Sequence, residues 1–191
     1  MYLDQQWKDL PKERRKAYVI GEEGITAELE ALDIQWTGRS EADFAPLDQR
    51  EVLQIADSID ADVSAVVMGF DRFFCYRKMA TAHYHLTQRE DHASVAFIAT
   101  NADATYPAGD HLFPGTGAMV AAVAKSTGRS PTVIGKPNEA MLQTVLTAYH
   151  LDPARTMMVG DRLDTDIAFG KRGGLKTLLV LTGMKRRLLV K

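Results

Sequence analysis

The chain has 191 residues, with 23 lysines and arginines against 25 aspartates and glutamates and a hydrophobic fraction of 46%. This nearly balanced charge gives no reason to expect a nucleic acid or a membrane surface as partner, and the hydrophobic content excludes general disorder. Cys75 is the only cysteine. An internal disulfide is therefore excluded, and a reducing, cytoplasmic location is expected for a chain that shows neither a signal peptide nor a membrane-spanning run.

The first third of the chain predicts one short strand and two helices. Residues 17–21 form an apolar run that ends in glycine, which is typical of a buried strand. A helix is expected over residues 24–32, a polar and turn-rich stretch over 33–48, and a second helix over 49–59.

The middle third predicts a longer strand at residues 63–69. Asp71 follows it and is expected to cap a helix from residue 72 to about 86. A further buried strand at 94–100 should open into a loop at 101–107, and a helix of small residues is expected at 118–126.

The last third alternates strands and helices again. Strands are expected at residues 131–135, 157–160 and 176–181, and helices at 139–150 and 164–171. Strands that alternate with helices indicate an α/β fold with a largely parallel sheet.

Charged residues follow two of these strands directly. Lys136 comes after one strand, Asp161 comes after another, and Asp166 lies five residues further on. Ligands of open α/β sheets bind outside the carboxyl ends of the strands, and paired carboxylates suit a hard cation such as Mg²⁺. Asp161 and Asp166 are therefore candidate metal ligands, although helix capping would explain the Asp164 and Asp166 carboxylates equally well.

Lys136 strengthens the metal interpretation. An ammonium and a metal-binding carboxylate at one sheet edge would neutralise the charge of a phosphoryl group during its transfer. A lysine that is merely solvated in a loop is the alternative for Lys136 taken alone.

The motifs around these residues resemble the haloacid dehalogenase superfamily, and within it the p-nitrophenylphosphatase, phosphoglycolate phosphatase and pyridoxal phosphatase (chronophin) branch. The resemblance rests on Gly-Lys-Pro-Asn at 135–138, Asp-Pro-Ala-Arg-Thr at 152–156 and Val-Gly-Asp-Arg-Leu-Asp-Thr-Asp-Ile at 159–167. It implies a partial Rossmann-like core with a large inserted α/β cap of the C2 type. Residues 1–21 would be a core remnant with one strand, 22–130 the cap, and 131–191 the C-terminal core portion.

The resemblance also implies roles for single residues. Lys136 would hold the phosphoryl group, Asp161 would bind Mg²⁺, and Asp166 would support that metal site. Asp103 and Tyr106 of the cap would help to choose the substrate, a small phosphorylated metabolite. Caps of this type often mediate dimers, so a homodimer through the cap is an expected assembly.

One family motif has no counterpart here. Members of the family use a strand that ends in Asp-x-Asp-Gly, whose first aspartate is the nucleophile, and no such sequence occurs in the chain. The strand at 17–21 is consequently expected to lack a partner, since core segments at both ends are expected to be missing. Two hypotheses follow: a Mg²⁺-dependent phosphomonoester phosphatase that needs a nucleophile segment absent here, or an inert truncated homologue that binds a partner or assembles with itself.

Overall fold

The computed structural model describes residues 2–181, which divide into two compact units. Unit 1 comprises Leu3–Val133, and unit 2 begins at Ile134. The end of the predicted C-terminal core portion, residues 182–191, lies outside the described residues. Within residues 2–181, none of the helices has the length and hydropathy needed to cross a membrane.

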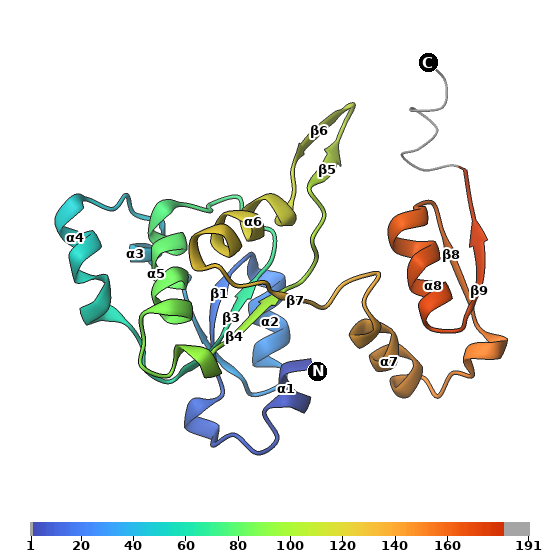
Figure 1. The fold of residues 1–191 in the computed structure, drawn as a ribbon, viewed down its shortest axis with the longest axis horizontal. Coiled ribbons are helices and arrows are strands. Elements are labelled where there is room, and N and C mark those ends of the chain that lie inside the picture. The colour runs from blue at the N-terminus through green and yellow to red at the C-terminus, as the bar shows by residue number, and fades with distance from the viewer. Residues whose placement is uncertain (1, 182–191) are drawn as a thin grey trace. The chain divides into compact units, whose positions relative to one another are not determined.

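Unit 1 is built on a five-stranded sheet (Figure 1). Its strands in chain order are β1 (Lys16–Ile20), β2 (Gln35–Thr37), β3 (Val63–Met68), β4 (Ala96–Ala99) and β7 (Thr132–Val133). They lie in the order β2-β1-β3-β4-β7, and all neighbours are parallel. Since the chain passes from β1 to one side for β2 and then to the other side for β3, the strand order reverses between β1 and β3.

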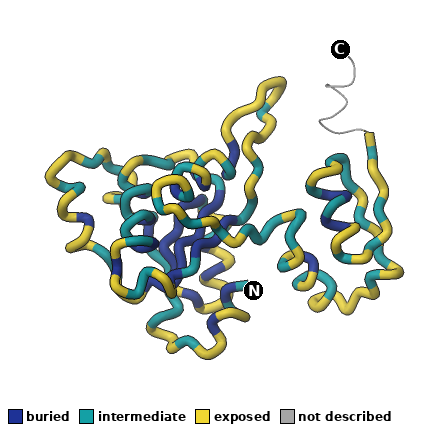
Figure 2. The backbone as a smooth tube through the Cα atoms, in the orientation of Figure 1, coloured by how far each residue is buried: buried dark blue, intermediate teal, exposed yellow. Residues whose placement is uncertain are grey.

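Both faces of this sheet are covered, which explains why every residue of β3 except Ser64 is apolar. All six residues of β3 are buried (Figure 2). Tyr18 and Ile20 share a core cluster with residues of two helices, α5 (Tyr76–Thr87) and α6 (Thr116–Thr127). The alternate residues Ala17 and Val19 are buried as well. Burial on both faces is the usual condition of parallel sheets.

One helix of unit 1, α1, precedes β1, and the others lie in the connections between strands. Their bounds are α1 Tyr2–Gln6, α2 Glu23–Glu30, α3 Glu41–Phe44, α4 Gln49–Gln54, α5 Tyr76–Thr87 and α6 Thr116–Thr127. A short antiparallel hairpin, β5 (Thr105–Ala108) with β6 (His111–Pro114), lies between β4 and α6.

Unit 2 has a smaller two-stranded parallel sheet. It consists of β8 (Met157–Gly160) and β9 (Lys176–Leu179), with α7 (Glu139–Ala148) preceding β8. A single π-helical turn, η5 (Leu163–Ile167), leads from β8 into α8 (Ala168–Arg172). The α/β class expected from the sequence is confirmed.

Several local expectations need correction. The strand at 17–21 was expected to lack a partner, but β1 pairs with both β2 and β3, because parallel partners far along the chain complete its ladder. The division of the chain into residues 1–21, 22–130 and 131–191 stays a prediction. The strand expected at 131–135 is reduced to β7, which pairs with β4 in unit 1.

Two loops and one helix start also differ from expectation. The stretch at 33–48 contains β2 and α3, and the loop at 101–107 ends in strand β5. Asp71 does not cap a helix that begins at residue 72: α5 begins at Tyr76, with Cys75 at its N-cap. The Asp71 side chain is fully buried instead and is bound to Lys78.

Candidate functional site

Lys136 and Asp166 of unit 2 form an ion pair. The Lys136 Nζ atom donates to Asp166 Oδ1 over 2.8 Å. The Asp166 side chain is 7% exposed and that of Lys136 is 40% exposed. The Lys136 ammonium is partly exposed to solvent and is held by a buried carboxylate. It can therefore contact an anionic ligand from a fixed orientation.

The other oxygen of Asp166 holds the turn that follows β8. Asp166 Oδ2 accepts the backbone N–H groups of Asp161, at 3.1 Å, and Arg162, at 3.2 Å. The structure therefore brings together Lys136, Asp161 and Asp166, the three residues that the sequence places at this site. Asp161 is half-buried at the carboxyl end of β8.

Glycine at position 160 makes this arrangement fit. A Cβ atom there would lie 2.3 Å from Asp166 Cβ and 2.4 Å from Asp166 Oδ2. Any larger residue would collide with the carboxylate, so the close approach of η5 to the end of β8 requires Gly160.

Electrostatics favour the ionised form of Asp166. Burial by itself would raise the pKa of Asp166, but the hydrogen bond from Lys136, the N–H groups of Arg162 and Asp161, and the Lys136 charge outweigh it and lower the pKa below the ordinary value. The site is thus a carboxylate and ammonium pair and not a pair of neutral groups.

The donor set fits a divalent metal only in part. Asp161 supplies the oxygen chemistry that a hard cation prefers. Both oxygens of Asp166 are engaged by N–H donors, which suits a supporting role better than direct ligation. Among residues 2–181, no group of three or more histidine, cysteine, aspartate or glutamate side chains is placed to hold a metal.

The two candidate specificity residues belong to unit 1. Asp103 follows β4, and its backbone N–H donates to Asn101 Oδ1 over 3.1 Å. Tyr106 lies on β5 and is 37% exposed, with its ring packed edge-on against Phe70 at 4.8 Å between centroids.

Sequence reasoning missed one charged feature, the buried pair of Asp71 and Lys78. Lys78 Nζ lies 2.7 Å from Asp71 Oδ2, and neither side chain is exposed. The signal was present in the spacing of α5, because Lys78 falls on the same stripe as the buried Ala82, His85 and Leu86.

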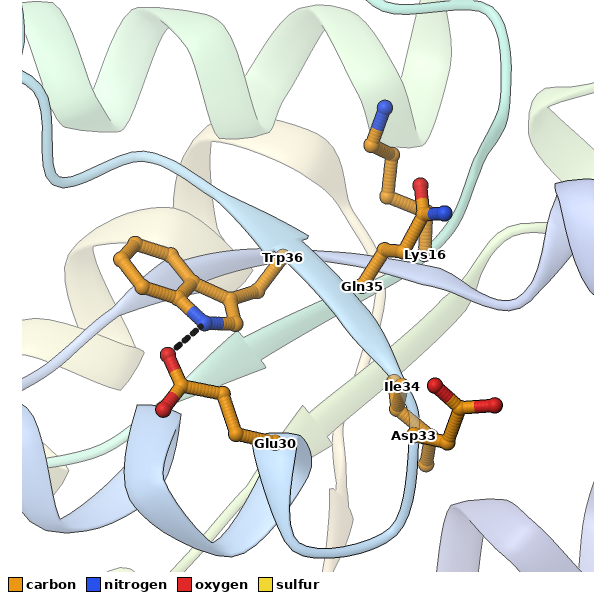
Figure 3. Close-up of a pocket in the computed structure, with 6 residues that line it drawn as sticks. All are labelled: Lys16, Glu30, Asp33, Ile34, Gln35 and Trp36. Atoms are coloured by element: carbon orange, nitrogen blue, oxygen red, sulfur yellow. Dashed lines mark hydrogen bonds between the residues drawn. The ribbon is translucent and has the colours of Figure 1, made fainter.

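A shallow hollow of about 360 Å³ marks another part of unit 1 (Figure 3). Trp36 and Glu30 line it, joined by a hydrogen bond of 2.9 Å, together with Lys16 and Gln35. Lys16 and Gln35 are the first residues of β1 and β2. The hollow therefore lies at the amino edge of the sheet, away from the carboxyl edge where ligands of such sheets bind.

Comparison with known proteins points to one group of hydrolases. The HAD-hydrolase-like family model matches residues 133–191. Phosphoglycolate phosphatase 1A of Arabidopsis thaliana is 41% identical over 181 residues, and human chronophin is 37% identical over 185 residues. These matches cover 92% and 96% of this chain but 47% and 57% of the relatives, so the chain spans about half of their length.

Solved structures give the same picture. The p-nitrophenyl phosphatase from Archaeoglobus fulgidus matches with a TM-score of 0.72 at 28% identity, over 100% of this chain and 66% of its own. A glycerol phosphate phosphatase from Mycobacterium tuberculosis, solved in complex with calcium, matches with a TM-score of 0.72 at 28% identity, over 95% of this chain and 46% of its own.

Proposed function

We infer, from its membership of the haloacid dehalogenase-like hydrolases, that this chain is part of a phosphomonoester phosphatase that acts on small phosphorylated metabolites. The observation that carries this proposal is the Lys136–Asp166 pair, which anchors the backbone of Asp161 at the end of β8. A fixed ammonium beside a strand-end carboxylate is suited to a phosphoryl group, whose negative charge both a cation and an ammonium stabilise.

In this proposal each residue has a separate task. Lys136 binds the phosphoryl oxygens, Asp166 orients Lys136 and fixes the turn, and Asp161 holds a divalent metal. Mg²⁺ is the metal we propose, because its preference for oxygen ligands matches a carboxylate site, and when bound it supplies positive charge to the transferring group. The aspartate nucleophile used by this family is not among the residues that we assign.

The substrate would be a small phosphomonoester, with Asp103 and Tyr106 contributing to its selection. The names of the relatives favour phosphoglycolate and glycerol phosphate as first candidates. Assembly into a homodimer through the expected cap at residues 22–130 and a cytoplasmic location are further parts of the proposal.

The test is hydrolysis of p-nitrophenyl phosphate, with and without Mg²⁺, by the purified chain alone and by the chain with an added N-terminal strand that ends in Asp-x-Asp-Gly, which supplies the nucleophile. Turnover should require the metal, and Lys136→Met should lower it by about 10²- to 10³-fold, as expected when one group that stabilises the transition state is removed. Lys171→Met is the matched control, because Lys171 is an exposed lysine of α8 in the same unit.

Metal binding gives a second readout. Calorimetric titration with Mg²⁺ should show binding that Asp161→Asn abolishes. If the unsubstituted chain neither turns over substrate nor binds metal, and instead forms an oligomer on sizing, the alternative of an inert binding or self-assembling homologue is favoured.

A further inference from the structure

The buried ion pair of Asp71 and Lys78 in unit 1 has no part in the proposed phosphoryl site. Lysine is almost never fully buried unless it is paired, and a buried pair costs desolvation that a hydrophobic pair would avoid. Lys78 Nζ also lies 4.3 Å from the centroid of the Phe44 ring, so α5, α3 and the loop after β3 all meet at this ammonium. Such an arrangement constrains geometry more than it adds stability.

The geometry that it constrains is the loop at 69–75. Asp71 Oδ1 accepts the N–H of Phe73 at 2.8 Å, while Asp71 Oδ2 binds Lys78. At the start of the loop, the Gly69 N–H donates to Ile20 O over 2.8 Å, which joins it to β1. Phe70 therefore lies between two anchored residues, at the carboxyl edge of the sheet where the strand order reverses between β1 and β3.

Phe70 in turn contacts the hairpin. Its ring packs edge-on against Tyr106, at 4.8 Å and an interplanar angle of 71°. The base of the hairpin is fixed separately, because the N–H groups of Gly115 and Gly117 donate to Ala104 O and Asp103 O. The contact with Phe70 therefore affects the orientation of the Tyr106 ring, because the backbone at the base of the hairpin is fixed by these other hydrogen bonds.

We propose that Asp71 and Lys78 are positioning residues that set the direction of the Tyr106 ring through Phe70, and thereby determine which phosphomonoesters are preferred. The inference rests on the proposed function in one respect, the role of Tyr106 in substrate selection. The link from the ion pair to the ring stands on the contacts within unit 1 alone.

The decisive variant is the double substitution Asp71→Leu with Lys78→Met. A single substitution leaves one buried charge uncompensated and is strongly destabilising, whereas hydrophobic residues of similar volume at both positions commonly preserve stability. The double variant should keep the unfolding midpoint but lose the nuclear Overhauser contact between the Phe70 and Tyr106 rings. Its selectivity between p-nitrophenyl phosphate and phosphoglycolate should shift by about tenfold, the usual size of one lost packing contact in a pocket.

The matched control removes another ion pair from the same sheet. Lys16 Nζ and Asp60 Oδ2 also lie 2.7 Å apart, at the amino ends of the strands, so Lys16→Met with Asp60→Asn should leave the Tyr106 ring unchanged. Phe70→Leu removes the aromatic contact with Tyr106 and leaves the Asp71–Lys78 pair in place. It should change the Tyr106 ring and the selectivity as the double variant does, and it serves as the test if the double variant does not fold.

The inference is overturned if the folded double variant, or Phe70→Leu, keeps the Tyr106 ring resonances and the selectivity of the unsubstituted chain. Failure of the proposed function looks different. In that case the chain with the added Asp-x-Asp-Gly strand shows no turnover, while the ring contact is present and still depends on the Asp71–Lys78 pair.

Discussion

Gly160 illustrates how a single residue determines the geometry of the candidate site. The Asp166 carboxylate occupies the space that a side chain at 160 would need, and Asp166 in turn holds Lys136 and the turn at Asp161. The absence of one Cβ atom thus allows three functional groups to meet.

Gly160→Ala is therefore expected to disrupt the site. The added methyl group should displace Asp166 and lower the free energy of unfolding by about 1–3 kcal/mol, the usual cost of overpacking. Urea denaturation measures the change. Gly24→Ala is the control, because a Cβ at Gly24 in α2 meets nothing within 4 Å. That variant should be neutral or more stable by up to about 1 kcal/mol; an equal loss in both variants would contradict the steric explanation.

His85 is a buried histidine with a pH-dependent effect on stability. Burial, followed by the charge of Arg89, lowers its pKa to about 4, against the smaller opposing influence of Asp60 and Asp91. Arg89 Nη1 donates to His85 Nδ1 at 3.3 Å, and the ring of Tyr18 lies 5.3 Å away. The folded protein therefore keeps this imidazole neutral at pH values where an unfolded chain would protonate it.

We expect the free energy of unfolding to decrease as the pH is lowered from about 6.5, the ordinary pKa of histidine, to about 4. In that window the unfolded chain binds a proton that the folded chain does not, at a total cost of up to about 3 kcal/mol. Thermal unfolding across this range measures it. His85→Gln, which cannot titrate, should flatten the profile, while His83→Gln on the same helix should not. A profile unchanged by His85→Gln would refute the assignment.

Residue spacing predicted the grouping of Lys136, Asp161 and Asp166, because the sequence places Lys136 and Asp161 at the ends of expected strands and Asp166 near the start of the expected helix that follows. It did not predict the pair of Asp71 and Lys78. Their contact depends on the path of the loop at 69–75, and an aspartate after a strand equally suits a helix cap, the role that the sequence suggested for Asp71.

Among the elements, α4 begins at a local sequence signal. Asp48 Oδ1 accepts the N–H groups of Arg50 and Glu51, both at 2.8 Å, and Glu51 Oε2 accepts the N–H of Asp48 at 2.8 Å. This reciprocal capping box satisfies backbone donors that the first helical turn leaves open. Its residues are close in sequence, so the helix start could be anticipated.

Asp48→Ala should destabilise unit 1 by about 1 kcal/mol. Hydrogen exchange at the amides of Arg50 and Glu51 should accelerate, because their acceptor is lost. Asp48→Asn keeps an acceptor oxygen and serves as the control. If both variants exchange alike, the cap does not hold the helix start.

The strands show the opposite situation. β2 has only three residues and lies within a stretch that the sequence predicts to be polar and turn-rich, so its pairing with β1 could not be foreseen. The pairing of β1 with β3 could not be foreseen either, because β3 lies more than forty residues further along the chain. Parallel pairing joins distant segments, and local propensity does not encode the partner.

At the scale of the whole molecule, the core is unevenly divided. Every residue of the main core cluster belongs to unit 1. In unit 2 the buried hydrophobic residues are Leu142, Ile167 and Phe169, as far as the described part of that unit extends. Strand β8 alternates between exposed and half-buried residues, whereas β3 is buried throughout.

Native-state hydrogen exchange should therefore proceed by separate units. Amides of β3 should be protected up to the global free energy of unfolding, whereas those of β8 and β9 should exchange through openings of lower free energy, because few apolar contacts hold them. Mass spectrometry of peptides covering 63–68 and 157–160 compares the two directly. Equal protection in both peptides would show that the two units unfold as one.

By itself, the sequence determined the α/β class, the positions of most helices and longer strands, and the residues that meet at the end of β8. These follow from hydrophobic periodicity, capping residues and the placement of charge after strands, all of which act over a few residues. The tertiary structure alone decided that β1 joins the sheet of unit 1, that Asp166 binds both Lys136 and the turn at Asp161, and that Asp71 is buried against Lys78. Each of these depends on contacts between distant segments, whose free energy is gained only when the chain is folded.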